Sequence, residues 1–137
     1  MAAYVRSALA REWTEDFAPT RGVKPGRFLI VGGGPSLKRS LGAIKKAKKK
    51  GFPVLAVNAA SRYLVDHGVV PDVVACLDPH PIVEDLIVMR DDITYLVASQ
   101  CSPQLFDALE GKRVVLWHGY DRTYPPGGDT GEERTPV

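Results

Sequence analysis

The chain has 137 residues, a length typical of one domain, and its 45% hydrophobic and 25% charged residues are ordinary for a globular protein. The net charge of +2 does not itself favour nucleic acid, and no apolar stretch approaches the ~20 residues that cross a bilayer. Cys76 and Cys101 lack metal-ligand spacing and are expected to be core thiols, so we expect a cytoplasmic protein without a membrane partner.

The amino-terminal segment is expected to be helical. Val5, Leu9 and Trp13 recur every four residues among charged ones, which predicts an amphipathic helix over about residues 2–16. Prolines and glycines in 19–26 then predict a linker, so that 1–26 form an N-terminal helix and linker.

Short apolar runs and helical segments alternate through the rest of the chain. Apolar spacing from Leu37 to Ala47 predicts one helix, Tyr63 and Leu64 lie in a second that Gly68 ends, and 80–90 form a weakly marked third. A last helix begins at a Ser102 cap with Pro103 at its first position and ends at Gly111. The predicted strands are the five apolar runs at 28–31, 54–57, 73–77, 95–98 and 114–117.

This alternation is typical of βαβ units with right-handed crossovers. It predicts an α/β fold: a Rossmann-like, doubly wound, mainly parallel five-stranded sheet with flanking helices, over residues 27–121. Residues 122–137 contain prolines, glycines and charges but no apolar run, and are expected to be a flexible tail.

The most informative segment is FLIVGGGPSL, at residues 28–37. Glycines after a buried strand let a ligand approach the backbone, and the next helix offers unpaired amides to an anion. We expect Gly32, Gly33, Gly34, Pro35 and Ser36 to bind phosphate, with the Ser36 hydroxyl capping the helix. Leu37 stands where a dinucleotide fingerprint needs its third glycine, and no Walker lysine follows, so both of those motifs are disfavoured. The alternative is a turn whose glycines serve packing alone.

Polar residues also follow the other predicted strands. In a doubly wound sheet, ligands bind beyond the carboxyl ends of the strands, near the reversal of strand order. Asp78 is a candidate Mg²⁺ ligand or a turn aspartate, His80 a general acid or base or a surface residue, and Asn58 a pocket residue or a helix cap. The remaining candidates at strand ends are Ser99, Gln100, His118 and Asp121.

Five lysines crowd residues 45–50. Ile44 and Ala47 continue the apolar stripe of that helix, which places most of these lysines on its outer face. A solvated face is the favoured interpretation, and nucleic acid is a minor alternative because no aromatic residues interleave.

Three motifs together carry a family resemblance: VGGGPSL at 31–37, AVNAASRYL at 56–64 and GVVPDVVACLDPH at 68–80. In this order and spacing they resemble the archaeal-type 6-hydroxymethylpterin diphosphokinase-like family. The resemblance implies a Rossmann-like domain and transfer of diphosphate from ATP to a hydroxymethyl pterin with Mg²⁺. It implies that 32–36 contact phosphate, that Asn58 lines the pocket, and that Asp78 is the metal-binding or catalytic carboxylate.

The glycine-proline-serine signature also resembles that of bacterial sialyltransferases, which use a CMP-activated sugar. Three hypotheses follow: an ATP-dependent diphosphokinase, a CMP-sugar glycosyltransferase, and a non-catalytic module that binds a nucleotide or docks a partner. Members of the diphosphokinase-like family usually continue with a further glycine-rich helix start and strand, which motivates the third hypothesis. The expected partners are a nucleotide and a small-molecule acceptor, and a homo-oligomer is left open.

Overall fold

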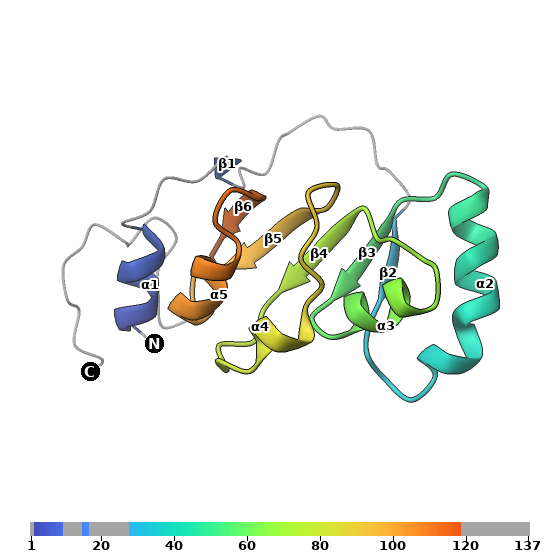
Figure 1. The fold of residues 1–137 in the computed structure, drawn as a ribbon, viewed down its shortest axis with the longest axis horizontal. Helices are drawn as coiled ribbons and strands as arrows, with labels where there is room; N and C mark the ends of the chain where they lie inside the picture. Colours follow the sequence, from blue (N-terminus) through green and yellow to red (C-terminus); the bar gives the residue numbers. More distant parts are fainter. Residues whose placement is uncertain (1, 10–14, 17–27, 119–137) are drawn as a thin grey trace.

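The computed structural model describes residues 2–9, 15–16 and 28–118. The elements in chain order are α1 (Ala2–Leu9), β1 (Glu15–Asp16), β2 (Leu29–Val31), α2 (Leu37–Lys49), β3 (Val54–Val57), α3 (Ala60–Asp66), β4 (Val73–Cys76), α4 (Val83–Leu86), β5 (Thr94–Ala98), α5 (Pro103–Ala108) and β6 (Arg113–Trp117). The strands form one parallel sheet in the order β1-β6-β5-β4-β3-β2, flanked by helices (Figure 1). The predicted α/β class, the parallel sheet and all five predicted strands are confirmed.

From β2 to β6, each strand lies beside the one before it in the chain. Right-handed crossovers that all step in one direction place their helices on one face of the sheet. Burial agrees, because Val54 and Ala56 are buried on the helix-covered face while Leu55 and Val57, on the opposite face, are only partly buried. The reversal of strand order expected near the glycine loop is not found in the described strands, where β2 is an edge.

The predicted helix over 2–16 is confirmed over 2–9 and wrong at residues 15–16, and its part at 10–14 lies outside the described residues. Helix α1 ends at Leu9, and Glu15 and Asp16 form β1, which pairs in parallel with Val115 and Leu116 of β6. The backbone of β6 offers a pairing edge that lies far away in the sequence, and local apolar spacing carries no sign of it. The expected linker at 19–26 and tail at 122–137 lie outside the described residues.

The helix signals near α5 are confirmed in detail. The Ser102 Oγ accepts a hydrogen bond from the Leu105 amide at 3.3 Å, Pro103 opens the helix, and Gly111 follows with φ of +75°. Gly68, after α3, also has a positive φ, of +81°. The weakly marked segment 80–90 is helical only over the four residues of α4.

The core lies between the sheet and its helices. Tyr95 of β5 and Phe106 of α5 are among the largest fully buried side chains. Cys76 and Cys101 are buried there as free thiols, as predicted, and burial raises the pKa of Cys101 to about 12. These thiols are therefore protonated core groups rather than nucleophiles. None of the described helices has the length and apolar character needed to span a membrane.

Candidate functional site

The glycine loop joins the end of β2 to the first turn of α2. None of Gly32, Gly33 and Gly34 has a φ in the left-handed range, so the backbone does not require glycine at these positions. A Cβ would meet nothing within 4 Å at Gly32 or Gly34, and at Gly33 only the Ala60 amide nitrogen at 4.0 Å. Neither strain nor close packing explains the three glycines, which argues against the packing-only interpretation. What the glycines do provide is open space above the backbone.

The amides of this loop are largely unpaired. The Leu37 amide donates to the Gly34 carbonyl at 3.0 Å, and the Ser40 amide to the Ser36 carbonyl at 3.0 Å. The amides of Gly33, Gly34 and Lys38 have no hydrogen-bond partner among the described residues. They stand at the amino terminus of a 13-residue helix, where the helix dipole is positive. The loop therefore has the donors that an anionic group would need.

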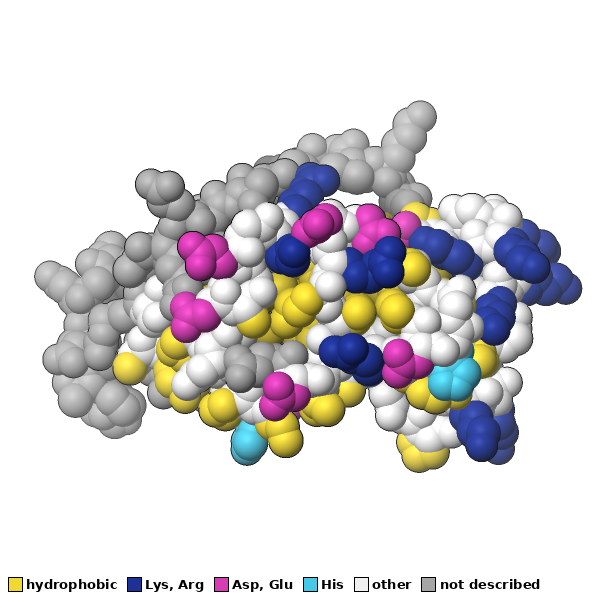
Figure 2. Space-filling model, in the orientation of Figure 1, with side chains coloured by type: hydrophobic (Ala, Val, Ile, Leu, Met, Phe, Trp, Pro, Cys, Tyr) yellow, Lys and Arg dark blue, Asp and Glu magenta, His cyan; other side chains and the backbone are white. Residues whose placement is uncertain are grey.

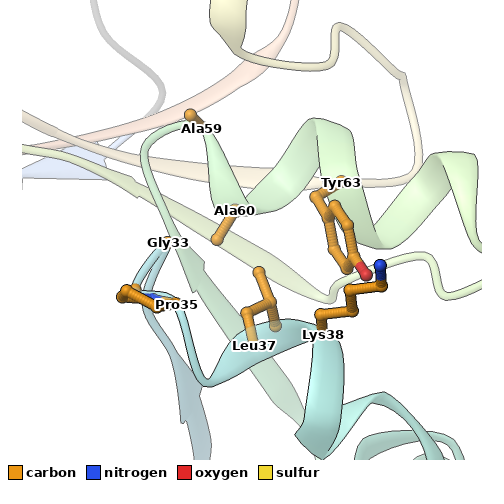
Figure 3. Close-up of a pocket in the computed structure, with 8 residues that line it drawn as sticks. Gly33, Pro35, Leu37, Lys38, Ala59, Ala60 and Tyr63 are labelled. Carbon is orange, nitrogen blue, oxygen red and sulfur yellow. The ribbon is translucent and has the colours of Figure 1, made fainter.

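A pocket of about 360 Å³ opens beside this loop, between the first turns of α2 and α3 (Figure 3). Its floor and walls are mostly small or apolar. Lys38 and Tyr63 stand on one side, with their polar ends directed toward each other. The lining residues are Gly33, Gly34, Pro35, Leu37, Lys38, Ala59, Ala60 and Tyr63. Side chains therefore do not fill the space beside the glycine loop at the junction of β2 and α2.

Lys38 and Tyr63 were not among the predicted site residues. Lys38 is the second residue of α2, so its position directly after the GGGPSL motif was an available signal. Tyr63 was predicted only as part of a helix, and the approach of α3 to α2 is a tertiary feature that local sequence does not reveal. Its ring also stacks on His67, with centroids 4.1 Å apart.

The expected cap by Ser36 is wrong. Ser36 occupies the N-cap position of α2, but its φ of −74° and ψ of −15° are helical and its hydroxyl makes no capping bond. A capping side chain needs an extended backbone at its own residue to reach the amides ahead of it. Ser102, with ψ of 147°, has that backbone. The Ser36 hydroxyl is exposed and is not used to close the helix end.

Asn58 holds two strand ends together. Its Oδ1 accepts a hydrogen bond from the Leu77 amide at 3.1 Å, and its own amide donates to the Ala75 carbonyl at 2.9 Å. Among the described non-glycine residues it alone has a positive φ, of 47°. It does not cap α3, whose N-cap is Ala59. Asn58 itself does not line the pocket beside the glycine loop, but the next residue, Ala59, does.

Asp78 forms the turn that the sequence left as an alternative to metal binding. Its Oδ1 accepts a hydrogen bond from the His80 amide at 2.9 Å. The Nδ1 of His80 in turn accepts from the Ile82 amide at 3.4 Å, so a neutral His80 carries its proton on Nε2. Both side chains are exposed, and the Oδ2 of Asp78 has no hydrogen bond to the described residues.

Ser99 and Gln100 lie farther along the same sheet edge. The Ser99 Oγ is 2.9 Å from the Nδ1 of His118, and the Gln100 amide group donates to the Leu77 carbonyl at 3.5 Å. Asp121 lies outside the described residues. Strands in a sheet are ~4.8 Å apart, so the ends of β2 and β6 are separated by four spacings, about 19 Å. The polar strand ends therefore form a row rather than one cluster.

Of the predicted set, the structure gathers Gly33, Gly34 and Pro35 at the pocket, and Gly32 and Ser36 flank them in the chain without lining it. Asn58, Leu77 and Gln100 form a second group at the ends of β3, β4 and β5, with Asp78 next to it. No group of three or more His, Cys, Asp and Glu side chains in the described part of the chain is arranged to hold a metal ion. A single carboxylate such as that of Asp78 is compatible with a Mg²⁺ ion held mainly by phosphate oxygens, since Mg²⁺ often takes only one or two protein carboxylates.

A parallel sheet, one-sided crossovers and a glycine-rich first corner define a Rossmann-like α/β protein with an anion-competent loop. The chain belongs to the MptE-like family, described as 6-hydroxymethylpterin diphosphokinase MptE-like, whose match extends over residues 9–133. This confirms the resemblance drawn from the three sequence motifs.

Among solved structures, the chain is similar to the Maf glycosyltransferase from Magnetospirillum magneticum AMB-1. The TM-score is 0.65 at 16% identity, covering 90% of this chain and 21% of that one. At this identity the likeness establishes the fold, and the chain spans about a fifth of the length of that structure. A search of curated proteins found no match to the chain.

Proposed function

We propose that the chain binds the phosphates of a nucleotide at the glycine loop and acts as a nucleotide-dependent transferase. The observation that carries this proposal is the loop itself: three glycines that neither backbone strain nor packing requires, beside unpaired amides and an open pocket. Membership of the MptE-like family supports the same class of reaction. The amino group of Lys38 would add a cation next to the bound phosphates.

The most specific form of the proposal is diphosphate transfer from ATP to a 6-hydroxymethylpterin-like alcohol, in the cytoplasm. The acceptor oxygen attacks the β-phosphorus, the bond from that phosphorus to the oxygen bridging the α- and β-phosphates breaks, and AMP leaves. The hydroxyl proton passes to solvent or to a base. Mg²⁺ would neutralise charge on the phosphates, and the protein would contribute mainly positioning.

Asp78 and His80 have separate roles in this scheme. The free Oδ2 of Asp78 is the atom that would meet the cation. The strand ends of β2 and β4 are two spacings apart, about 10 Å, so the phosphates would extend along the sheet edge from the glycine loop. The Nε2–H of His80 would donate to a phosphate oxygen, because its Nδ1 already accepts a hydrogen bond. This favours the acid rather than the base role for His80.

The direct test supplies ATP, Mg²⁺ and 6-hydroxymethylpterin and follows the release of AMP. We expect AMP in proportion to acceptor, and loss of turnover in Gly33→Leu, whose side chain would occupy the pocket. Gly42→Leu is the matched control, since Gly42 lies on the exposed side of α2 with nothing within 4 Å of an added Cβ. Asp78→Asn should abolish the Mg²⁺ dependence of nucleotide binding but leave the fold unchanged.

A CMP-sugar glycosyltransferase is the second candidate. It is favoured by the glycine-proline-serine signature and by the fold shared with a structure titled a glycosyltransferase. Thermal shifts that are larger with CMP than with ATP would favour it. A non-catalytic module is the third candidate, and it would bind nucleotide tightly without producing AMP or free sugar from any donor.

A further inference from the structure

The row of polar strand ends finishes in a pair of side chains that the proposed phosphate site does not use. The Ser99 Oγ lies 2.9 Å from the Nδ1 of His118, and the pair joins the residues that follow β5 and β6. The backbone continues the strand pairing up to this point, because the Ser99 amide donates to the Trp117 carbonyl at 2.9 Å. Ser99 is only 4% exposed, whereas His118 is exposed. A buried hydroxyl therefore supports an exposed histidine.

The imidazole of His118 has one nitrogen left for a ligand. Its Nδ1 faces the Ser99 hydroxyl, and its Nε2 has no hydrogen bond to the part of the chain that the structure describes. A hydrogen bond at one ring nitrogen fixes the orientation of the ring and determines what the other nitrogen does. Because a serine hydroxyl either donates or accepts, the free Nε2 can pair with an acceptor or with a donor of a ligand.

Charge changes along the row from β2 to β6. Lysine and arginine side chains gather at the α2 end of the molecule, and Lys38 lines the pocket beside the glycine loop (Figures 1 and 2). Asp78, at the end of β4, contributes a carboxylate to the middle of the row. At the far end, Ser99, Gln100 and a neutral His118 carry no charge. The β2 end therefore suits phosphate, the middle suits a cation, and the far end suits a neutral polar ligand.

The row is also longer than the phosphates of one nucleotide. The ends of β2 and β6 are about 19 Å apart, with β4 midway between them. Phosphates held by the glycine amides and by a cation at Asp78 would cover the half from β2 to β4. A nucleoside in the pocket of about 360 Å³ would place AMP at the β2 end. Since in-line attack comes from the side opposite the leaving group, the acceptor would approach from β5 and β6.

We propose that His118, positioned by Ser99, binds the acceptor alcohol at the β5–β6 end of this row. The ligand class is a neutral molecule that carries a hydroxyl and further hydrogen-bonding groups, one of which pairs with the Nε2 of His118. His118 orients the acceptor, and no proton transfer is assigned to it. This inference rests on the proposed function and adds to it the place of the acceptor.

Steady-state kinetics test the assignment, with ATP and 6-hydroxymethylpterin varied in turn in the presence of Mg²⁺ while AMP release is followed. In His118→Ala we expect the KM for the acceptor to rise at least tenfold and the KM for ATP to change less than twofold. Ser99→Ala should raise the acceptor KM at least threefold, because it frees the ring without removing it. His118→Gln keeps a hydrogen-bonding group and should recover part of the loss.

Ser102→Ala is the matched control, because Ser102 is also a buried serine after β5 but its hydroxyl caps α5. It should lower stability without changing either KM. Thermal unfolding identifies any variant that does not fold. NMR of the histidine rings in the parent gives a second measurement that needs no variant fold and no turnover: the acceptor should shift the His118 signals, and ATP with Mg²⁺ should not.

The outcomes separate this inference from the proposed function. If the parent releases AMP but His118→Ala leaves the acceptor KM unchanged, the inference is overturned and the proposed function stands. A rise in the KM for ATP alone would place the nucleotide, not the acceptor, at His118 and would also overturn it. If the parent binds ATP but releases no AMP, the proposed diphosphate transfer fails, and His118 signals that the acceptor does not shift would overturn the inference as well.

Discussion

The side chain of Asn58 joins the ends of β3 and β4: its Oδ1 atom accepts a hydrogen bond from the Leu77 amide at 3.1 Å. The bond extends the strand pairing by one step, in the turn that leads to pocket-lining Ala59. The backbone of Asn58 is left-handed, with φ of 47°. Asparagine tolerates this conformation better than most residues. The position of α3 relative to the glycine loop therefore depends on this residue.

Asn58→Ala should destabilise the fold by about 2 kcal/mol, because it leaves the Leu77 amide unpaired and strains the left-handed backbone. Asn58→Gly should lose less, since glycine relieves the strain, and Asn58→Asp should lose least because it keeps the acceptor. Urea unfolding of the three variants measures this order. An alanine variant as stable as the parent would contradict the structural role.

The two serines at helix starts provide a matched pair. Ser102→Ala removes a capping bond to the Leu105 amide and should cost about 1 kcal/mol. Ser36→Ala removes a hydroxyl that makes no capping bond and should change the unfolding free energy by less than about 0.5 kcal/mol. Chemical denaturation of both variants distinguishes them, and equal losses would show that Ser36 caps α2 after all.

The lowered pKa of Asp72 should make the free energy of unfolding depend on pH in the acidic range. Desolvation raises the pKa of this carboxyl, but hydrogen bonds from Lys48 and the Val54 amide, and the charge of Lys48, outweigh it and lower the pKa below 3.8. A lowered pKa in the folded state gives stability that is present above 3.8 and is lost as the pH falls through the lowered value. The stability difference between the parent and Asp72→Asn should therefore shrink as the pH falls through that range. Unfolding measured over a pH series tests this, and a difference independent of pH would contradict it.

Gly42 offers a stabilising substitution. It lies inside α2, on the exposed side, and an added Cβ would meet nothing within 4 Å. Gly42→Ala should raise stability by about 0.5–1 kcal/mol through helix propensity, as measured by thermal or urea unfolding. A loss of stability would mean that α2 packs more closely on this side than described.

Local sequence signals were sufficient for most of the fold. The five apolar runs form strands, and Ser102 and Pro103 start α5 as predicted. Buried strands of a parallel sheet and capped helix starts both produce patterns among residues that are adjacent in the sequence. Strand β1 was not predicted because Glu15 and Asp16 are polar and their partners in β6 lie far along the chain. The pocket was also not predicted, because Tyr63 and Lys38 line it together only through the packing of two helices.

The glycine loop was found from sequence, but not its setting. Its residues predict an anion site, whereas its place on the edge strand β2 depends on strand order, which local patterns do not encode. The direction of the Ser36 backbone likewise decides whether its hydroxyl can cap, and both a capped and an uncapped start are compatible with the same residues.

We propose that the amides of Gly33, Gly34 and Lys38 bind the phosphates of a nucleotide, and amide NMR observes each of these groups separately. Titration of the labelled chain with ATP and Mg²⁺ should shift the Gly33, Gly34 and Lys38 signals together and saturably, and Gly33→Leu should abolish the shifts. Unchanged signals at these three amides at saturating nucleotide, or shifts confined to other regions, would show that the loop does not bind the phosphates.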